Sequence, residues 1–245
     1  MRSRDLSWDG CLNVRDLGGH ATESGAETRF GAVVRADSVR QLSDAGWEAL
    51  VGYGIARIVD LRFRSELEAD PPGEIGVELV HIPLVREERL QEFDDTARAQ
   101  RGTIERTREF YGWALECFSP NFGHAIAAVA DAPAGGVLVH CLAGKDRTGL
   151  VVALLLRLVG VARADVAADY AVSEVKLAPL LEGWVAAAET DEERAERRRM
   201  SASPSGLMLD VLGELEDSHG GVAGYLRTAG LTEGQLDRIR ARLLG

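Results

Sequence analysis

The chain has 245 residues and a mass of 26.4 kDa, and 46% of its residues are hydrophobic and 27% charged, which is typical of a folded globular protein and excludes pervasive disorder. Its formal net charge of −11 repels polyanions, so we exclude nucleic acid as a partner and expect any anionic substrate to be captured locally. The longest apolar run, residues 150–159, contains Arg157 and is too short to cross a bilayer. We therefore expect no stable membrane insertion.

The three cysteines, Cys11, Cys117 and Cys141, show no paired spacing of the kind that binds a metal. They therefore do not suggest a metal site, and we expect no metal and no cofactor. Residues 1–5 lack the apolar core of a signal peptide, and unpaired thiols suit a reducing compartment. These features predict a cytoplasmic protein and leave its oligomeric state open.

In chain order, the first expected feature is an extended segment at residues 8–20 that ends in a turn at Gly18 and Gly19. Within it, Arg15 and Asp16 fit either a surface ion pair or a structural role beneath the loop described below. Short runs of β-branched and other apolar residues then predict strands at 32–35, 56–62, 77–84 and 135–141.

Helices are expected between these strands and after the last one. Ser43 is the predicted N-cap of a helix through Tyr53 that serves packing only. Ser65 and Glu68 match a capping box for a short helix. That helix should stop at Pro71 and Pro72, and further helices should begin at Ser119-Pro120 and Arg147 and lie at 165–170, 191–199, 222–228 and 232–244.

Charged residues mark the ends of several predicted elements. Asp60 and Arg62 end the second strand, at the edge where open α/β sheets bind ligands, and we expect them to form a structural ion pair. His81 is interpreted as polar packing rather than as a catalytic residue. The arginines at 197–199 fit a solvated helix face, and contact with anionic lipid is the alternative.

Residues 86–118 carry many charges and few apolar side chains. The charge run fits a solvated helical connection, and its position before the last strand also fits a helical lid over the substrate entrance. Together the elements predict an α/β protein of three layers, with a mostly parallel central sheet, this helical insertion and a helical C-terminal third. We expect one domain over residues 1–245.

Residues 137–149 predict a strand, a tight loop and the start of a helix, with Cys141 ending the strand and Arg147 beginning the helix. A loop of five residues lets backbone N–H groups converge on a tetrahedral anion, and the helix N-terminus adds a positive dipole. The Arg147 guanidinium can bind two anion oxygens, and the same field favours a Cys141 thiolate aimed at phosphorus. The predicted phosphate-binding residues are Leu142, Ala143, Gly144, Lys145, Asp146 and Arg147.

Three other interpretations fit a cysteine at this point. A cysteine after a buried strand is often a small core residue, but the glycine and the charged residues of this loop disfavour that role. A rhodanese-like sulfurtransferase has a shorter loop. A phosphate-binding module would normally lack either the cysteine or the arginine. A phosphate-dependent binding protein with negligible turnover, which would keep the cradle but lose acid or thiolate reactivity, is kept as the second functional class.

The ten residues from His140 to Gly149 resemble the loop His-Cys-x-Ala-Gly-Lys-Asp-Arg-Thr-Gly of the bacterial tyrosine/lipid phosphatase family, typified by a mycobacterial protein tyrosine phosphatase. A Cys-x5-Arg match alone would be weak, but the likeness covers nearly the whole chain. Residues 13–19 resemble the family's Asn-Phe-Arg-Asp segment, and Asp60-Leu61-Arg62 with Glu66 resembles its Asp-Leu-Arg strand end. Asp169-Tyr170 resembles part of the family's helix after the loop, and residues 220–232 resemble its C-terminal helices.

The resemblance implies a protein tyrosine phosphatase-like fold and phosphomonoester hydrolysis through a phosphocysteine on Cys141. The implied substrates are phosphorylated proteins, bearing phosphotyrosine and also phosphoserine or phosphothreonine, and phosphoinositides. In the family, the lysine equivalent to Lys145 accompanies lipid activity. Thr148 is implied to hydrogen-bond the Cys141 sulfur or aid its departure, and His140 to order the loop backbone. The family also forms a lid from the region of 86–118 and includes exported members without an obvious signal.

The general acid that protonates the leaving group is the least determined part of this site. The family commonly places an aspartate just after the strand equivalent to residues 81–84, but this chain has Val85 and Arg86 there. We therefore predict Asp146, although its flanking cations favour its ionised form. The alternatives, in order, are Glu87 or Glu88 and then Asp60.

Overall fold

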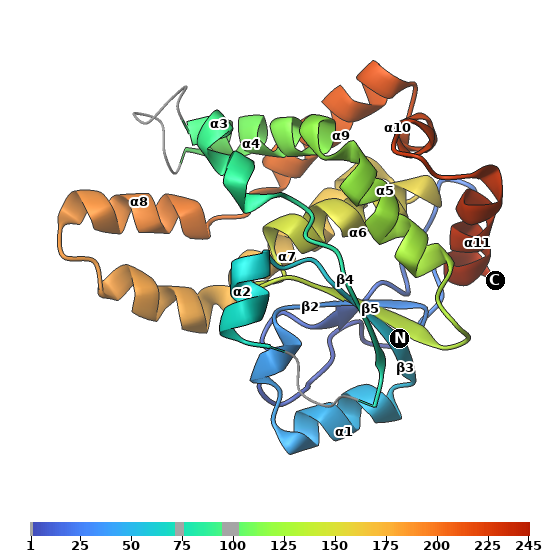
Figure 1. Ribbon diagram of the computed structural model, residues 1–245, viewed down its shortest axis with the longest axis horizontal. Helices are drawn as coiled ribbons and strands as arrows, with labels where there is room; N and C mark the ends of the chain where they lie inside the picture. The colour runs from blue at the N-terminus through green and yellow to red at the C-terminus, as the bar shows by residue number, and fades with distance from the viewer. Residues whose placement is uncertain (1, 72–75, 95–102) are drawn as a thin grey trace.

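A five-stranded sheet forms the centre of the computed structural model, which describes residues 2–71, 76–94 and 103–245 (Figure 1). The strand order is β1-β2-β5-β3-β4, and only β1 runs antiparallel to its neighbour. The mostly parallel sheet that we predicted is therefore confirmed. The strands are β1 (Arg15–Asp16), β2 (Val33–Ala36), β3 (Ile55–Asp60), β4 (Glu78–His81) and β5 (Gly136–His140).

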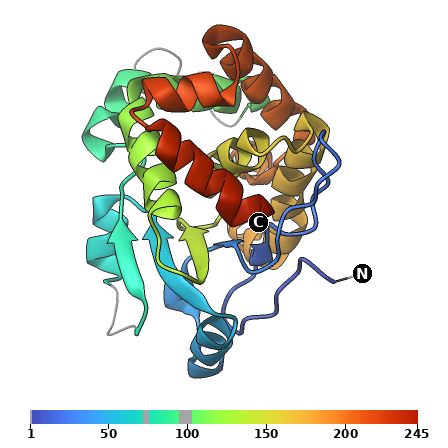
Figure 2. The same ribbon diagram turned by 90° about the vertical axis from the view of Figure 1, so that its right-hand side faces the viewer.

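Helices cover both faces of this sheet and make up the C-terminal third (Figures 1 and 2). Within the described ranges, no helix is long and apolar enough to cross a membrane. The α-helices are α1 (Asp44–Gly52), α2 (Arg64–Ala69), α3 (Leu90–Asp94), α4 (Ile104–Cys117), α5 (Ser119–Ala130), α6 (Asp146–Leu158), α7 (Arg163–Ala186), α8 (Asp191–Ser201), α9 (Ser205–His219), α10 (Val222–Thr228) and α11 (Glu233–Leu244), with short 3-10 turns at Val39–Gln41 and Glu87–Arg89.

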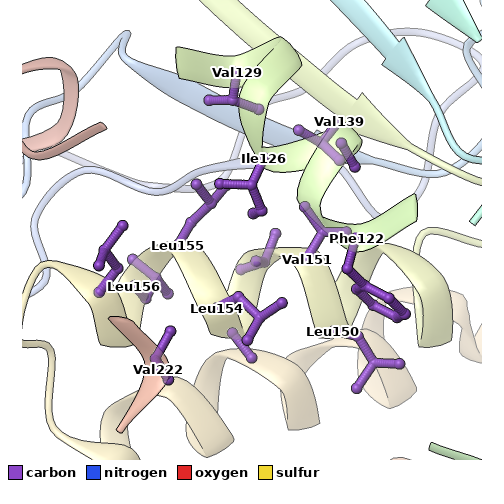
Figure 3. Packing of buried hydrophobic residues seen from close by; sticks show 14 of the residues in the cluster. Phe122, Ile126, Val129, Val139, Leu150, Val151, Leu154, Leu155, Leu156 and Val222 are labelled. Carbon is purple, nitrogen blue, oxygen red and sulfur yellow. The ribbon is translucent and has the colours of Figure 1, made fainter. Parts of the chain in front are cut away.

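Alternate residues of β2, β3 and β5 point into two apolar clusters, as a strand period of two requires. Val59 and Val139 face the larger cluster, which includes side chains of α4–α7 and α9–α11. Ile58 and Leu138 face a smaller cluster that includes Leu50 of α1. In Figure 3, Phe122, Ile126 and Val129 of α5 pack against Val151 and Leu155 of α6. The expected three-layer α/β arrangement is thereby confirmed.

Several predicted boundaries hold to within a residue or two. Ser43 caps α1, its side chain accepting a hydrogen bond from the Gly46 N–H. Helix α5 begins at Ser119 itself, because Phe118 already serves as the cap between α4 and α5. The proposed capping box was wrong. Helix α2 begins one residue earlier than Ser65, and the Phe63 N–H donates to Glu66 Oε2 at 2.7 Å.

The helical C-terminal third is more extensive than the predicted helices. Helix α7 continues to Ala186, well beyond the predicted 165–170, and includes Pro179. Helix α9 was not predicted at all. Figure 1 shows α7 and α8 as a hairpin that extends away from the sheet. Two sequence interpretations fall outside the described residues, namely the stop at Pro72 and the part of the predicted lid at 95–102.

The carboxyl ends of β2, β5 and β3 meet at one edge of the sheet. His140 is paired with Ala36 on one side and Asp60 on the other. The chain therefore leaves the sheet at Cys141 between the segments that follow β2 and β3, the position at which parallel α/β sheets bind ligands.

Candidate active site

In the loop after β5, four successive carbonyl groups point away from the centre of the loop and accept hydrogen bonds from surrounding residues. Cys141 O lies 3.0 Å from His140 Nδ1, and Leu142 O accepts from the Ser38 N–H at 2.8 Å. Ala143 O accepts from Asn13 Nδ2 at 3.0 Å, and Gly144 O accepts from Arg35 Nη2 at 2.6 Å. A peptide unit whose carbonyl is held outward presents the following N–H to the opposite side.

The N–H groups of residues 142–147 have no hydrogen-bond partner among the described residues. They belong to the loop and to the first turn of α6, whose N–H groups lack intrahelical acceptors. Such groups form an anion site together with the helix dipole. The side chain of Cys141, only 2% exposed, follows β5 at the base of this loop.

Gly144 is required by the path of the loop. Its φ angle is +64°, which disfavours residues with a Cβ. An added Cβ would lie 2.3 Å from Ala36 O, well inside van der Waals contact. The loop therefore lies directly against the end of β2.

A buried ion cluster supports the loop from below. The Asp169 carboxylate on α7 accepts from Arg15 Nε at 2.9 Å and from Arg35 Nη1 at 2.6 Å. Arg15 also donates to Asn13 Oδ1 at 2.6 Å. All four side chains are buried. Burial disfavours the carboxylate, but the two arginines hold the pKa of Asp169 well below its usual value, and burial lowers the pKa of Arg35 to about 10, which still leaves it charged.

Of the two interpretations of residues 15 and 16, the structure supports the role beneath the loop for Arg15, because this side chain is 1% exposed. Asp16 is equally buried but acts elsewhere, accepting from the Gly18 and Gly31 N–H groups. The two residues do not form a surface ion pair.

Arg147 is held in place by Glu66 and Phe63. Its Nη1 and Nη2 donate to the two Glu66 carboxylate oxygens at 2.5 and 2.9 Å, and its guanidinium carbon lies 4.2 Å from the centre of the Phe63 ring. Burial opposes the charge of Arg147, but the nearby Cys141 and Glu66 raise the pKa of Arg147 above its usual value. The arginine is therefore a fixed cation beside the cysteine.

A cavity of about 490 Å³ opens beside Asp146 and Arg147. Four aromatic and three other apolar side chains line it together with five charged ones, and such a mixed lining suits a flat apolar group that is anchored by an anion at one end. The lining residues are Phe63, Val85, Leu90, Phe93, Arg106, Thr107, Phe110, Tyr111, Lys145, Asp146, Arg147, Glu196 and Met200.

Lys145 lines this cavity, but its ammonium group is engaged by the end of α8. Its Nζ donates to Met200 O at 2.6 Å and to Ala202 O at 3.2 Å. Its distance to Asp146 Oδ1 is 3.7 Å. In this structure, Lys145 therefore links the phosphate loop to α8.

Asp146 begins α6 and is partly exposed to the cavity, with 42% of its side chain accessible. Its Oδ1 accepts a short hydrogen bond from the Tyr111 hydroxyl on α4. The Tyr111 oxygen in turn lies 2.9 Å from the Tyr170 oxygen on α7. Burial and the Asp146 charge raise the pKa of Tyr111 well above its usual value, so this hydroxyl stays protonated.

Asp60 and Arg62 form the buried ion pair that the sequence predicted. Arg62 Nη2 lies 2.8 Å from Asp60 Oδ2, and the Arg62 N–H donates to Asp60 Oδ1 at 3.0 Å. Burial lowers the pKa of His140, which favours the neutral imidazole. His81 Nε2 bonds to Arg62 O at 2.9 Å, in agreement with polar packing.

Glu87 is exposed and accepts from Ser65, at 3.1 Å from its N–H and closer from its hydroxyl. These hydrogen bonds lower the pKa of Glu87, and Glu87 is not among the residues that line the cavity beside Arg147. Neighbouring Glu88 pairs loosely with Arg86 at 4.0 Å. Thr148 Oγ1 is buried and has no hydrogen-bond partner among the described residues. The hydrogen bond to the Cys141 sulfur that the resemblance implied is therefore not formed in this structure.

The sequence analysis missed most of the residues that hold this site in shape. Only the family resemblance pointed to Glu66 and Asp169, and nothing marked Arg35 or Tyr111, which come from elements far from the loop in sequence. Across the ranges that the structure covers, no group of three or more His, Cys, Asp or Glu side chains could hold a metal ion.

Comparison with known proteins extends the similarity over the whole chain. The sequence model of a family described as "Tyrosine phosphatase family" matches residues 6–245. A tyrosine-protein phosphatase from Nostoc commune is 31% identical over 229 residues, which cover 86% of this chain and 74% of that protein. The triple specificity protein phosphatase PtpB of Mycobacterium tuberculosis is 28% identical over 286 residues, and this alignment covers 100% of this chain and 100% of that protein.

Proposed function

Because the chain belongs to the tyrosine phosphatase family, we propose that it hydrolyses phosphotyrosine monoesters through a phosphocysteine on Cys141. The observation that carries this proposal is the orientation of the loop, with the carbonyls of residues 141–144 bonded outward and the N–H groups of residues 142–147 left for an anion. A dianionic phosphoryl group fits such a cradle beside Arg147.

In the first step, the Cys141 thiolate attacks phosphorus, an S–P bond forms and the bond from phosphorus to the leaving oxygen breaks. Asp146 gives its proton to that oxygen. In the second step, water attacks phosphorus, Asp146 takes a proton from it, and the S–P bond breaks to give inorganic phosphate and the thiolate. The loop N–H groups and Arg147 stabilise the equatorial oxygens throughout.

Phosphotyrosine is favoured as the substrate by the cavity. Phe63, Phe93 and Phe110 line it, and their faces can contact a phenyl ring that enters with its phosphate towards Arg147. We extend the proposed range to phosphoserine or phosphothreonine and to phosphoinositides. The mycobacterial relative, named a triple specificity phosphatase, supports a wide range, and Lys145 beside the loop offers a further cation for an inositol ring with several phosphates.

We also retain three earlier expectations as proposals. Residues 86–118 would act as a lid, which is supported by the contribution of α4 to the cavity through Arg106, Thr107 and Phe110. A reducing, cytoplasmic setting would keep the Cys141 thiolate from forming a disulfide. The third expectation retained as a proposal is that residues 1–245 form a single domain.

The test is the release of 4-nitrophenolate from 4-nitrophenyl phosphate by the purified chain. The wild type should turn over, and Cys141→Ser should lose nearly all activity because an alcohol is a far weaker nucleophile. Cys141→Ser should still bind vanadate, since the loop and Arg147 remain, whereas Arg147→Ala should lose both activity and vanadate binding. Wild-type rates in Cys141→Ser would overturn the phosphocysteine mechanism, and vanadate binding by an inactive but folded wild type would favour the phosphate-dependent binding protein.

A further inference from the structure

The Tyr111 hydroxyl donates to Asp146 Oδ1 from a helix that is remote in sequence. We propose that Tyr111 is a positioning residue for the general acid, fixing Oδ1 so that the other carboxyl oxygen, Oδ2, carries the proton exchanged with the leaving group and then with water. This proposal rests on the proposed function. It adds to it a residue outside the phosphate loop that acts on the reaction through Asp146.

The first support is the asymmetry of the Asp146 carboxyl group. Its Oδ1 is occupied by the Tyr111 hydroxyl and faces Lys145 Nζ at 3.7 Å. No hydrogen bond within the described chain engages Oδ2, although the side chain is 42% exposed and lines the cavity. Oδ2 is therefore the carboxyl oxygen left to carry an exchangeable proton, because Oδ1 is already engaged by Tyr111.

The second support is the rigidity of the donor. Tyr111 is 1% exposed, and its ring meets the Tyr170 ring edge to face at 6.4 Å. The Tyr170 oxygen lies 2.9 Å from the Tyr111 oxygen. A buried ring held in this way has few rotamers, so its hydroxyl is a fixed reference for a partly exposed aspartate. Because Tyr111 stays protonated, it donates to Asp146 when the carboxyl is ionised.

Several other titratable groups lie around Asp146 on neighbouring elements. The Tyr111 bond is distinguished from them because it is a direct hydrogen bond from an uncharged group, and its removal leaves the net charge of the site unchanged. The groups that face or share the site are Lys145 before α6, Arg147 on α6, Arg106 on α4, Tyr170 on α7 and Glu196 on α8.

Tyr111→Phe tests the proposal in the full chain with two substrates of different leaving groups. Turnover of phenyl phosphate, a poor leaving group, should fall about tenfold, because the proton donor is no longer oriented. Turnover of 4-nitrophenyl phosphate should change by less than about twofold, since its leaving group needs little protonation. The basic limb of the pH–rate profile should move to higher pH, because the Asp146 carboxylate loses a donor that stabilises it.

Tyr170→Phe is the matched control, since it removes the other hydroxyl of the pair and leaves in place both the ring contact that fixes Tyr111 and the bond to Asp146. It should keep the leaving-group dependence of the wild type. Should Tyr111→Phe fold poorly, 3-fluorotyrosine at position 111 keeps the shape and is a stronger donor, and it should move the basic limb to lower pH. In the Asp146→Asn background, Tyr111→Phe should have no further effect on phenyl phosphate turnover.

An equal loss of turnover on both substrates in Tyr111→Phe would overturn the positioning role. A basic limb that moves neither in Tyr111→Phe nor with 3-fluorotyrosine at position 111 would also overturn it. So would an additive loss in the double variant. These outcomes are separate from failure of the proposed function, which would appear as Cys141→Ser activity or as an inactive wild type. If Asp146→Asn leaves phenyl phosphate turnover intact, the general-acid assignment fails and this proposal fails with it, while the phosphocysteine mechanism stands.

Discussion

Glu66 binds both terminal nitrogens of Arg147, at 2.5 and 2.9 Å, so the guanidinium is oriented before any phosphate arrives. The pair is mostly buried, with 14% of the Arg147 side chain and 18% of the Glu66 side chain exposed. A planar cation fixed on one edge offers its remaining N–H groups to a second anion in a single orientation. Glu66 therefore limits the entropy that phosphate binding would otherwise cost.

Glu66→Gln should weaken this orientation while keeping the shape of the side chain. We expect kcat/KM for 4-nitrophenyl phosphate to fall by about tenfold to a hundredfold, corresponding to about 1.4–2.8 kcal/mol. The measurement is a comparison of kcat/KM and the vanadate dissociation constant with those of the wild type. Arg147→Lys is the companion variant, and it should lose more, because an ammonium group cannot bind two oxygens in the plane of a guanidinium. A Glu66→Gln enzyme with wild-type constants would show that Arg147 orients itself.

Asp146→Asn should slow poor leaving groups by about a hundredfold or more and activated aryl phosphates far less. The physical reason is that only a poor leaving oxygen needs a proton in the transition state. A series of substituted phenyl phosphates provides the measurement, and the basic limb of the pH–rate profile should flatten. Glu87→Gln is the control, because Glu87 is exposed and bound to Ser65. If Glu87→Gln or Asp60→Asn shows the leaving-group pattern and Asp146→Asn does not, the assignment to Asp146 is wrong.

Lys145→Ala should reduce phosphoinositide turnover more than aryl phosphate turnover. An inositol ring with several phosphates can use a second cation beside the loop, whereas a phenyl ring cannot. Lys145 donates hydrogen bonds to Met200 O and Ala202 O, so Lys145→Met, which keeps much of the side-chain length, controls for packing against α8. The experiment compares phosphate release from soluble phosphoinositides with hydrolysis of 4-nitrophenyl phosphate. Equal losses on both substrates would remove the argument for lipid turnover.

Gly144→Ala should destabilise the fold by at least about 1–3 kcal/mol, because the new Cβ would strain a positive φ angle. It would also collide with Ala36 O. Vanadate affinity should fall as well, since relief of the collision displaces the loop N–H groups. Urea unfolding and vanadate titration measure the two effects. Gly206→Ala is a matched control, because nothing lies within 4 Å of its added Cβ and no positive φ is involved.

Asp169→Asn should cost about 3–5 kcal/mol of stability, because it leaves the buried Arg15 and Arg35 without their shared carboxylate. The pKa of Asp169 is held well below its usual value. The stabilisation by its charge is therefore complete above about pH 4 and is lost as the pH falls further. Chemical unfolding across this range should show a steeper acid loss for the wild type than for Asp169→Asn. Parallel curves would mean that Asp169 does not account for the acid sensitivity.

Much of the architecture was predictable because it depends on local patterns. The strand of residues 136–140 is a β-branched run buried on both faces, and the loop and helix after it follow from one glycine and a long apolar stretch. Ser43 capped its helix as expected because an N-cap is a contact over three residues. The family match over residues 6–245 confirms the resemblance that was drawn from the motifs.

The supporting residues were not predictable in this way. Arg35 lies in a short strand whose pattern indicates burial, and an arginine there has no local partner in the sequence. Its carboxylate, Asp169, is 134 residues away. Tyr111 falls within a charged stretch that favoured a solvated connection, yet it is fully buried against α7. Lys145 was assigned to phosphate from its place in the loop, but the structure pairs it with two carbonyls at the end of α8, a contact that no spacing encodes.

The hydrogen bonds that the loop carbonyls accept also determine whether the anion site could be transferred to another protein together with the loop sequence. Two of the carbonyls are held by side chains that lie 130 and 109 residues earlier in the chain, those of Asn13 and Arg35. The loop can take its shape only where these distant segments have met, so it depends on contacts of high sequence separation. A fragment that begins after residue 38 would keep the complete motif of residues 140–149. It would lack Asn13, Arg35 and Ser38, whose hydrogen bonds to the loop carbonyls orient the N–H groups towards the anion site. Grafting the ten-residue motif onto another strand and helix should accordingly transfer a cysteine and an arginine without the anion site.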